Sequence, residues 1–446
     1  MTVSVDAAPP VYRGHPLLGV GPEFRRDIFG TLLRAADVGP VVRFRLPPGV
    51  PIRSYGIFSP EATARVLVGE AEGYRKDSLP YQETAALFGD GLLTSQDERW
   101  RRQRRLVAPL FTPHRLAADY VPLLEGEADR LRERWLAAPS AIVDVHAESV
   151  RYTLRAIGRI LFGEELDGIL PTLTPAFAAG NAYLRHRITA SVPLPRTWPT
   201  PANLAGRKAR AKLYAVVDAV VAARRDRPGA GDDLLGRLLA ARDPDTGGAL
   251  SADEVRDQVL IFLLAGHETT STTLAFTLQL LARHPQIQQR VAAEVDRTGA
   301  GGRLPYTQQV INEALRLYPP AYAISRYTKA GGMLGGMQIL PESNIAIGTY
   351  ALHRDRQVWP EPERFDPGRF ADAAAAGRSR YSFLPFGGGP RICIGAQLAM
   401  AEASIAVARL VREHTICPAG AAAGPVPAGV VLRPGGPMPH QLVPRR

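Results

Sequence analysis

The chain has 446 residues, a formal net charge of +11 and only two cysteines, Cys393 and Cys417. Two cysteines exclude a disulfide framework and favour a reducing, cytoplasmic compartment. The basic residues are spread along the chain without a helix-turn-helix, zinc-finger or RNA-recognition signature, so nucleic acid is not an expected partner. Neither a low-complexity linker nor a repeat divides the sequence, and residues 1–446 are expected to form a single domain.

The N-terminal segment has neither a signal-peptide pattern nor an apolar run of about 20 residues, so no membrane anchor is expected. Apolar and polar residues alternate in three short segments, which predicts strands at residues 42–46, 52–57 and 344–349. Most of the remaining sequence has the apolar spacing of helices. The expected fold class is therefore mainly α with a small β-rich lobe.

A basic run at residues 99–105 contains Trp100 and Arg104. These two side chains are one helical turn apart, so both can face the same ligand. The ordinary interpretation of such a run is a solvated basic face. We expect that interpretation to hold for Arg101, Arg102 and Arg105, because all of these arginines cannot point at one cofactor.

A long helix is predicted over residues 251–284. Ser251 and Glu254 form a capping box at its start, and Pro285 ends the apolar pattern. About 33 residues span roughly 50 Å, enough to cross a domain. A polar cluster, Ala-Gly-His-Glu-Thr-Thr at residues 265–270, interrupts the apolar pattern; its threonines either bond their own helix backbone or serve a function.

Further along the chain, Glu313 and Arg316 lie three residues apart on a predicted helix that ends before Pro319 and Pro320. Such a pair is most often an ordinary surface ion pair and is a weak signal alone. Its position upstream of the segment around Arg369 and of the Cys393 loop makes it informative.

Residues 386–395 place Cys393 in a glycine-rich turn directly ahead of strong helix formers. A helix N-terminus and a nearby cation both lower a cysteine pKa, and the thiolate is the form that binds metals. The turn's glycines allow positive φ and leave room for a flat cofactor, while Arg391 offers a cation to a cofactor carboxylate. An isolated cysteine would more often be a buried thiol. The glycines are Gly387, Gly388, Gly389 and Gly395.

This turn matches every fixed position of the haem-ligand signature of the cytochrome P450 family, Phe-x-x-Gly-x-Arg-x-Cys-x-Gly. The matching residues are Phe386, Gly389, Arg391, Cys393 and Gly395. The chain therefore resembles that family over essentially its whole length. The resemblance implies the cytochrome P450 fold, haem b as cofactor, and Cys393 as the axial iron ligand whose thiolate favours O–O bond cleavage.

The polar cluster on the long helix is similar to the family's oxygen-binding motif, Ala/Gly-Gly-x-Asp/Glu-Thr-Thr/Ser. By this resemblance Ala265 and Gly266 leave room for dioxygen, Thr269 donates a hydrogen bond during oxygen activation, and Glu268 relays protons. His267 falls at the variable position of the motif. We expect it either at the surface or behind the site.

The resemblance also assigns residues that hold the cofactor and the core. Trp100, Arg104 and Arg326 join Arg391 as contacts of the haem propionates, because buried carboxylates need cations nearby. Glu313, Arg316 and Arg369 are expected to form a structural, non-catalytic triad. The expected haem-contacting positions also include Phe386, Gly387, Gly395, Ala265 and Gly266.

By resemblance, the substrate pocket draws on residues 79–92, 177–188, 321–325 and 433–439 and on one face of the long helix. These segments are mostly apolar, which favours a lipophilic substrate such as a terpenoid, polyketide or fatty-acyl molecule. The pocket residues expected by name are Phe262, Leu264, Ala265, Tyr322, Ala323 and Ile324.

The leading hypothesis is a monooxygenase of bacterial secondary metabolism that hydroxylates or epoxidises such a molecule with O2. The chain is too short for a fused reductase, so NAD(P)H electrons are expected through an external ferredoxin or flavodoxin and its reductase, steered by positive charge. The alternatives are a peroxide-driven peroxygenase, against which the Glu268–Thr269 pair argues, and a haem-based sensor, which would need an output domain. The enzyme is expected to be a cytoplasmic monomer.

Overall fold

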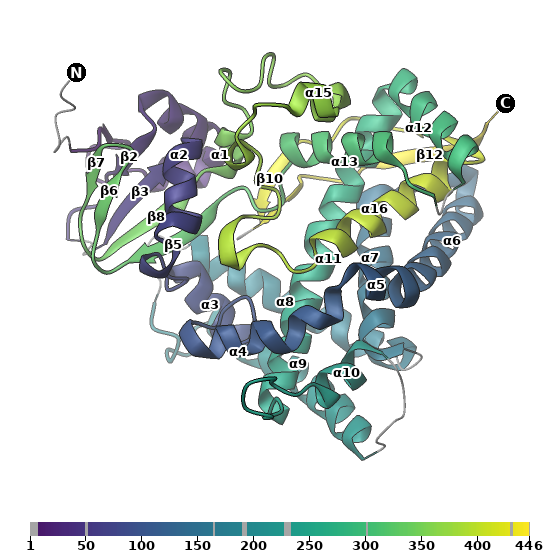
Figure 1. Ribbon diagram of the computed structural model, residues 1–446, viewed down its shortest axis with the longest axis horizontal. Helices are drawn as coiled ribbons and strands as arrows, with labels where there is room; N and C mark the ends of the chain where they lie inside the picture. Colours follow the sequence, from purple (N-terminus) through teal and green to yellow (C-terminus); the bar gives the residue numbers. More distant parts are fainter. Residues whose placement is uncertain are drawn as a thin grey trace.

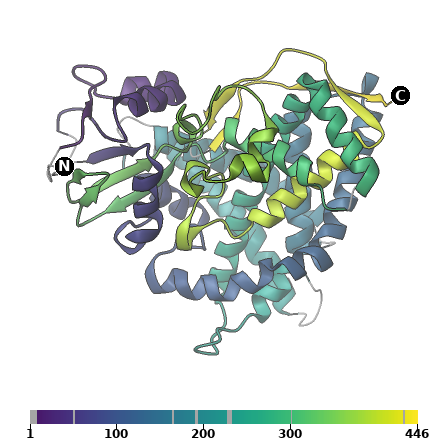
Figure 2. The same ribbon diagram turned by 45° about the horizontal axis from the view of Figure 1, so that its top comes forward.

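The computed structural model describes residues 8–49, 52–163, 166–189, 194–226, 233–299, 302–428 and 431–445. Helices make up most of the molecule, and a five-stranded sheet forms a lobe at one end of it (Figure 1). The view in Figure 2, turned by 45°, shows the same division. The mainly α fold with a small β-rich lobe is confirmed.

The larger described helices surround α11 (Ala252–Arg283), which contacts α7, α9, α13 and α16. The other helices are α1 (Gly21–Val38), α2 (Pro60–Ala64), α3 (Leu79–Phe88), α4 (Asp97–Val107), α5 (Pro113–Arg115), α6 (Val121–Ala137), α7 (Val145–Phe162), α8 (Leu166–Thr189), α9 (Pro201–Arg225), α10 (Leu234–Ala240), α12 (Pro285–Thr298), α13 (Pro305–Leu317), α14 (Thr349–Leu352), α15 (Asp372–Ala375) and α16 (Ala396–Val411).

The described strands form one five-stranded sheet, in the order β1-β2-β3-β8-β5, and three smaller sheets. Within the large sheet β3 pairs parallel with β8, and β5 pairs antiparallel with β8. The strands are β1 (Val11–Tyr12), β2 (Val41–Phe44), β3 (Arg53–Ile57), β4 (Ile142–Asp144), β5 (Ile324–Thr328), β6 (Gly332–Leu334), β7 (Met337–Ile339), β8 (Ser343–Ile347), β9 (His414–Pro418), β10 (Pro425–Ala428), β11 (Val431–Pro434) and β12 (Pro439–Pro444).

The three strands predicted from alternation correspond to β2, β3 and β8, with ends shifted by one or two residues. The alternation is real in the structure, because inward residues such as Ile345 and Ile347 of β8 are fully buried. The remaining strands are short or made by distant pairings, and local alternation does not reveal them.

The predicted long helix is confirmed as α11, which begins and ends within one residue of the predicted bounds. Ser251 Oγ accepts a hydrogen bond from the Glu254 N–H at 3.2 Å, and a Glu254 carboxylate oxygen accepts one from the Ser251 N–H at 2.9 Å. Together these bonds satisfy two backbone donors that a helix start would otherwise leave unpaired.

α11 is also long and apolar enough to pass as a membrane span by composition. In the fold 78% of its most apolar window is buried among other helices, so its apolar character is that of a core helix. This helix therefore runs through the interior and carries the polar cluster 265–270 to the centre of the molecule.

Candidate functional site

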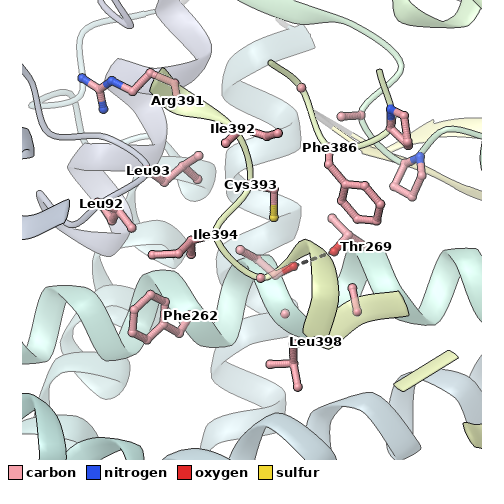
Figure 3. Close-up of a pocket in the computed structure, with 18 of the residues that line it drawn as sticks. Leu92, Leu93, Phe262, Thr269, Phe386, Arg391, Ile392, Cys393, Ile394 and Leu398 are labelled. Carbon is pink, nitrogen blue, oxygen red and sulfur yellow. Dashed lines mark hydrogen bonds between the residues drawn. The ribbon is translucent and has the colours of Figure 1, made fainter. Parts of the chain in front are cut away.

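A cavity of about 320 Å³ lies between the middle of α11 and the loop that leads into α16. Figure 3 shows the side chain of Cys393 directed from this loop toward the helix. The wall is mostly apolar. Its apolar side chains from outside the loop include Leu92, Leu93, Phe111, Ile157, Ile160, Ile261 and Phe262.

The backbone of the loop is shaped by two of its glycines. Gly387 and Gly389 have φ of 71° and 68°, in the left-handed region that favours glycine. A Cβ on Gly389 would lie 1.8 Å from the carbonyl oxygen of Leu67, so no larger residue fits there. Gly388 and Gly395 do not use this freedom, because their φ values are −161° and −89°.

Gly395 serves the site in another way. It lines the cavity, and a Cβ built on it would meet no atom within 4 Å, so the space beside it is open. Nearby, the Cys393 N–H donates to the Phe386 carbonyl oxygen at 2.9 Å and closes the loop across its base. Phe386 lines the cavity and packs on the small core cluster of α13 and α16. The loop therefore leaves open space beside Gly395 on its cavity side.

The part of Cys393 that stays exposed opens into the cavity, and the protein packs closely around the rest of the residue. Burial raises its pKa, and the Gly395 N–H, Arg104 and Lys76 only partly oppose that effect. The lowered pKa expected from the helix terminus and the cation is thus wrong for the protein alone, because desolvation outweighs both. A bound metal ion would itself stabilise the thiolate.

A cluster of cations lies on the same side of the cavity, formed by Lys76, Arg104, Arg326 and Arg391. The Arg391 guanidinium stacks 4.0 Å from the Trp100 ring centroid and donates to the Ser95 carbonyl oxygen at 2.9 Å. Burial and the charge of Arg326 lower the pKa of Arg391 to about 10. Burial, followed by repulsion from Arg326 and Arg391, also lowers the pKa of Lys76 well below its usual range.

This cation cluster lacks a protein counter-charge in the cavity. Among the described lining residues the single carboxyl group is that of Glu402, and burial, which raises its pKa well above the usual range, favours its neutral form. The Nη1 atom of Arg391 is buried without a hydrogen-bond partner. Buried cations of this kind require an anion, and the two propionates of haem b fit the cluster.

The sequence indicated Trp100, Arg104, Arg326 and Arg391 as propionate contacts, and the structure brings all four to one side of the cavity. It did not indicate Lys76. No helical or strand spacing links Lys76, just before α3, to the other cations, because only the tertiary fold places it beside them.

Five small or hydroxyl residues of α11 line the cavity: Ala265, Gly266, Thr269, Thr270 and Thr273. Thr269 Oγ1 donates to the Ala265 carbonyl oxygen at 2.6 Å (Figure 3). Thr269 therefore makes the hydrogen bond to its own helix backbone that is one of the two interpretations of the polar cluster. Its side chain also reaches the cavity. A Cβ on Gly266 would lie 3.1 Å from Ile157 in α7, so the glycine also permits close packing of α7.

Glu268 and His267 point elsewhere. Glu268 does not line the cavity; its Oε1 accepts a 2.7 Å hydrogen bond from Asn181 Nδ2 on α8, and burial raises its pKa. His267 is buried, with its Nδ1 2.5 Å from the Leu263 carbonyl oxygen. The expectation that His267 lies at the surface is wrong. α8 covers this face of α11, and the Phe177 ring of α8 packs edge-on against the imidazole.

The structure also brings together Glu313, Arg316 and Arg369. Glu313 and Arg316 are fully buried and joined by two 2.7 Å bonds, and Arg369 Nε lies 3.4 Å from Glu313 Oε1. Arg316 further donates to three backbone carbonyls, those of His353, Pro362 and Arg364. The cluster thus ties α13 to the segment that precedes the cysteine loop and does not touch the cavity.

Of the six residues expected by name in the substrate pocket, three line this cavity and three do not. Phe262, Ala265 and Ile324 line the cavity, whereas Leu264, Tyr322 and Ala323 do not. Leu264 lies off the face of α11 shared by residues 262, 265 and 269, as helical spacing requires. Tyr322 turns toward α1 and packs edge-on against Phe29. Residues 177–188 and 433–439, all in the described part of the chain, contribute nothing to the lining.

A cysteine that faces an apolar cavity, beside cations that need a carboxylate partner, is the arrangement expected of a haem-thiolate protein. A family model described as Cytochrome P450 matches residues 9–436. The chain belongs to the cytochrome P450 family. As a member it is a P450 monooxygenase, an oxidoreductase that uses haem, O2 and electrons derived from NAD(P)H.

Named relatives agree with this assignment. Cyclooctatin synthase of Streptomyces melanosporofaciens is 36% identical over 89% of this chain and 87% of its own length. Pentalenene oxygenase of Streptomyces avermitilis is 31% identical over 85% of this chain and 84% of its own length. Among solved structures, the haem domain of cytochrome P450DA matches with a TM-score of 0.86 and 27% identity, covering 99% of both chains.

Proposed function

We propose that this monooxygenase hydroxylates or epoxidises a terpenoid with few polar groups. The observation that carries the proposal is the apolar wall of the cavity, where α11 presents Ile261, Phe262 and Ala265 and the residues facing it are mainly aliphatic or aromatic. An apolar pocket selects an apolar body. The similarity to cyclooctatin synthase and pentalenene oxygenase, whose names refer to terpenoids, supports a terpenoid over a polyketide or fatty acid.

The substrate proposal is tested by optical titration of the purified haem-loaded enzyme. We expect terpene hydrocarbons and their alcohols to shift the Soret band as they displace water from the iron, at concentrations where fatty acids and macrolactones do not. A shift with fatty acids alone would contradict the terpenoid assignment. A thiolate-type band that moves with no terpene, polyketide or fatty acid would contradict it as well.

We infer that Thr269 and Glu268 control proton delivery at the site. When bound, haem supplies the redox-active iron at which O2 is activated. Thr269 supports the inference because its hydroxyl reaches the cavity, where it can receive and pass a proton through water. Glu268 supports it because burial raises the pKa of its carboxyl, bringing proton uptake and release closer to neutral pH.

Thr269→Ala is therefore expected to keep haem and substrate binding but to divert electrons into hydrogen peroxide. The measurement is product formed and peroxide formed per NAD(P)H consumed, with product falling severalfold. Thr277→Ala is the matched control, since Thr277 Oγ1 bonds the Thr273 carbonyl oxygen at 2.7 Å in the same manner but does not line the cavity. Full coupling of NAD(P)H consumption to product in Thr269→Ala would contradict the relay. Equal turnover of the parent enzyme with hydrogen peroxide alone would also contradict it and would favour a peroxygenase.

We also propose that the electron donor is a separate acidic ferredoxin or flavodoxin. The support is α4, which contacts the cysteine loop through Arg104 and the Ile392 carbonyl oxygen and exposes Arg99 and Arg101 on its outer side. Such a face attracts an acidic carrier and raises its association rate.

This docking proposal predicts that the bimolecular rate of haem reduction falls as salt is raised, because exposed charges are screened beyond about 8 Å at physiological ionic strength. Arg101→Gln is expected to lower that rate severalfold at low salt and to flatten its salt dependence. Arg53→Gln, an exposed arginine in the β-rich lobe, is the control and is expected to have no effect. Stopped-flow reduction that is insensitive to both salt and Arg101 would contradict the proposal.

We propose further that the chain works as a single-domain, cytoplasmic monomer in secondary metabolism. The match of one family model to residues 9–436 supports the single domain, and the burial of α11 supports a location away from the membrane. Analytical ultracentrifugation of the purified enzyme tests it, with one species of about monomer mass as the expected result.

A further inference from the structure

α4 brings Trp100 and Arg104 to the cavity, but hydrophobic burial does little to fix this helix. Seven of its 11 residues are charged, and only three are buried. With about 3.6 residues per turn, Arg102 and Arg105 lie on the face roughly opposite to Trp100 and Arg104. The groups that bind these two arginines therefore help to fix how α4 is turned toward the site.

Arg102 reaches an acidic segment at residues 243–254, which runs from the loop after α10 into the first turn of α11 and lies beside α4 (Figure 1). We call this segment the acidic loop. Arg102 Nη1 donates to Glu254 Oε1 at 2.8 Å, and its Nη2 donates to the Ala249 carbonyl oxygen at 2.6 Å. The other carboxylate oxygen of Glu254 accepts from the Ser251 N–H, so Glu254 joins the start of α11 to α4.

Arg105 binds the other end of the acidic loop. Its Nη2 donates to Asp243 Oδ2 at 3.2 Å, and its Nε lies 3.3 Å from Asp245 Oδ2. The Asp243 side chain is 0% exposed, and its Oδ1 accepts from the N–H groups of Asp245 and Thr246. The bond from the Asp245 N–H, followed by that from Arg105, outweighs burial and holds the pKa of Asp243 below its usual value, so the carboxylate is ionised. Arg102 and Arg105 are thus half-buried in ionic contacts and do not form the solvated face expected of them.

The spacing of the oxygens in the acidic loop is that of a calcium loop. An EF-hand loop follows the pattern Asp-x-Asp/Asn-x-Asp/Asn-Gly-x5-Glu, and its ligands include the carbonyl oxygen of its seventh residue. The acidic loop fits every fixed position except the fifth, which is Gly247. Its oxygens at the first, third, seventh and twelfth positions all contact the two guanidinium groups. Among the described residues no group of three or more His, Cys, Asp or Glu side chains is arranged for a metal ion, so the cation that this loop holds is arginine.

We propose that the acidic loop holds α4 by binding its two guanidinium groups in the place of a metal ion, and that Asp243 is thereby a positioning residue for Trp100 and Arg104. The proposal rests on these two residues as haem contacts and is independent of the substrate and of the proton relay. Arg104 also donates to the Ile392 carbonyl oxygen at 3.4 Å. α4 therefore joins the acidic loop on one face to the cysteine loop on the other, and weakening the first contact is expected to move the cation beside Cys393.

Asp243→Asn tests the proposal, because the asparagine Oδ1 can still accept from the loop N–H groups while Arg105 loses its charged partner. The readouts are the reduction potential of the haem-loaded enzyme and the rate of haem transfer to apomyoglobin. A cation near the iron favours its reduced form, so Arg104→Gln is expected to lower the potential. We expect Asp243→Asn to lower it as well and to speed haem transfer severalfold. Loss of a negative charge would by itself raise the potential, so a fall reports movement of Arg104.

A second variant of the same contact is Arg105→Gln, which is expected to speed haem transfer to a similar extent. The double variant Asp243→Asn/Arg105→Gln is expected to be no faster than the faster single variant, because both substitutions remove one contact. Asp253→Asn is the matched control. Asp253 lies in the same loop and pairs with Arg256 at 2.7 Å, but its side chain is 79% exposed, so parent values are expected.

The outcomes separate the positioning role from its basis. A lowered potential in Arg104→Gln with parent values in Asp243→Asn would overturn the positioning role and leave Arg104 as a haem contact. Parent values in both variants would overturn the proposal at its basis. Calorimetry of the parent enzyme with Ca²⁺ is expected to show no binding. Stoichiometric Ca²⁺ binding that is lost in Asp243→Asn would show that the loop's cation is a metal ion and would overturn the role given to the guanidinium groups.

Discussion

Cys393→Ser is expected to abolish both the thiolate-type Soret spectrum and monooxygenase activity. A serine hydroxyl ionises far less readily than a thiol, and even the native thiol has its pKa raised by burial in this loop. The substituted side chain therefore stays neutral and is a poor ligand. The measurement is the spectrum of the reduced, carbon-monoxide-bound enzyme together with product formation under NAD(P)H.

The chain offers a matched control in Cys417→Ser. Cys417 lies on β9 in the small sheet with β12, is partly exposed, and does not line the cavity. We expect this variant to keep the spectrum, the activity and the haem content of the parent. A thiolate-type spectrum surviving in Cys393→Ser and lost in Cys417→Ser would contradict the assignment of the ligand.

The fold features that the sequence predicts well are those encoded locally. The capping box at Ser251, the apolar spacing of α11 and the stop at Pro285 are all read from neighbouring residues, and the helix has those bounds. β9 and β12 could not be predicted in this way, because their pairing joins residues 414–418 and 439–444, which are distant along the chain. Their registers are set by burial in the tertiary fold.

The residues of the site also differ in whether local sequence predicts them. Cys393, Arg391 and Thr269 stand in compact motifs, and all three reach the cavity. Lys76 and Asn181 stand in no motif and reach the site only because α3 and α8 fold over it. The net direction of the Cys393 pKa was also beyond prediction, since the sequence shows nearby cations and a helix start but not how closely the fold surrounds the thiol.

The second large effect, a loss of stability, is expected from substitution of Glu313, which does not line the cavity. Glu313→Gln leaves Arg316, which is 0% exposed, as a buried charge without its carboxylate partner, and it weakens the bonds from the Asp366 N–H and Arg369. Breaking a buried ion pair in this way costs about 3–5 kcal/mol. We expect the urea midpoint of the holoenzyme to fall accordingly and haem to be lost early in the transition.

Glu361→Gln provides the control with the same chemistry and spacing. Glu361 and Arg364 also lie three residues apart and form a 3.0 Å ion pair, but their side chains are 70% and 63% exposed. Such surface pairs contribute about 0–1 kcal/mol, so the midpoint is expected to stay near that of the parent. Equal midpoints for the two variants would contradict a structural role for the buried cluster.

The Glu313 result also separates structural from catalytic residues. Because Glu313 does not line the cavity, the fraction of Glu313→Gln that retains haem is expected to couple electrons to product as the parent does. Thr269→Ala is expected to behave in the opposite way, with a normal midpoint and poor coupling. Peroxide release from haem-loaded Glu313→Gln at the Thr269→Ala level would show instead that the buried cluster controls the geometry of the oxygen site.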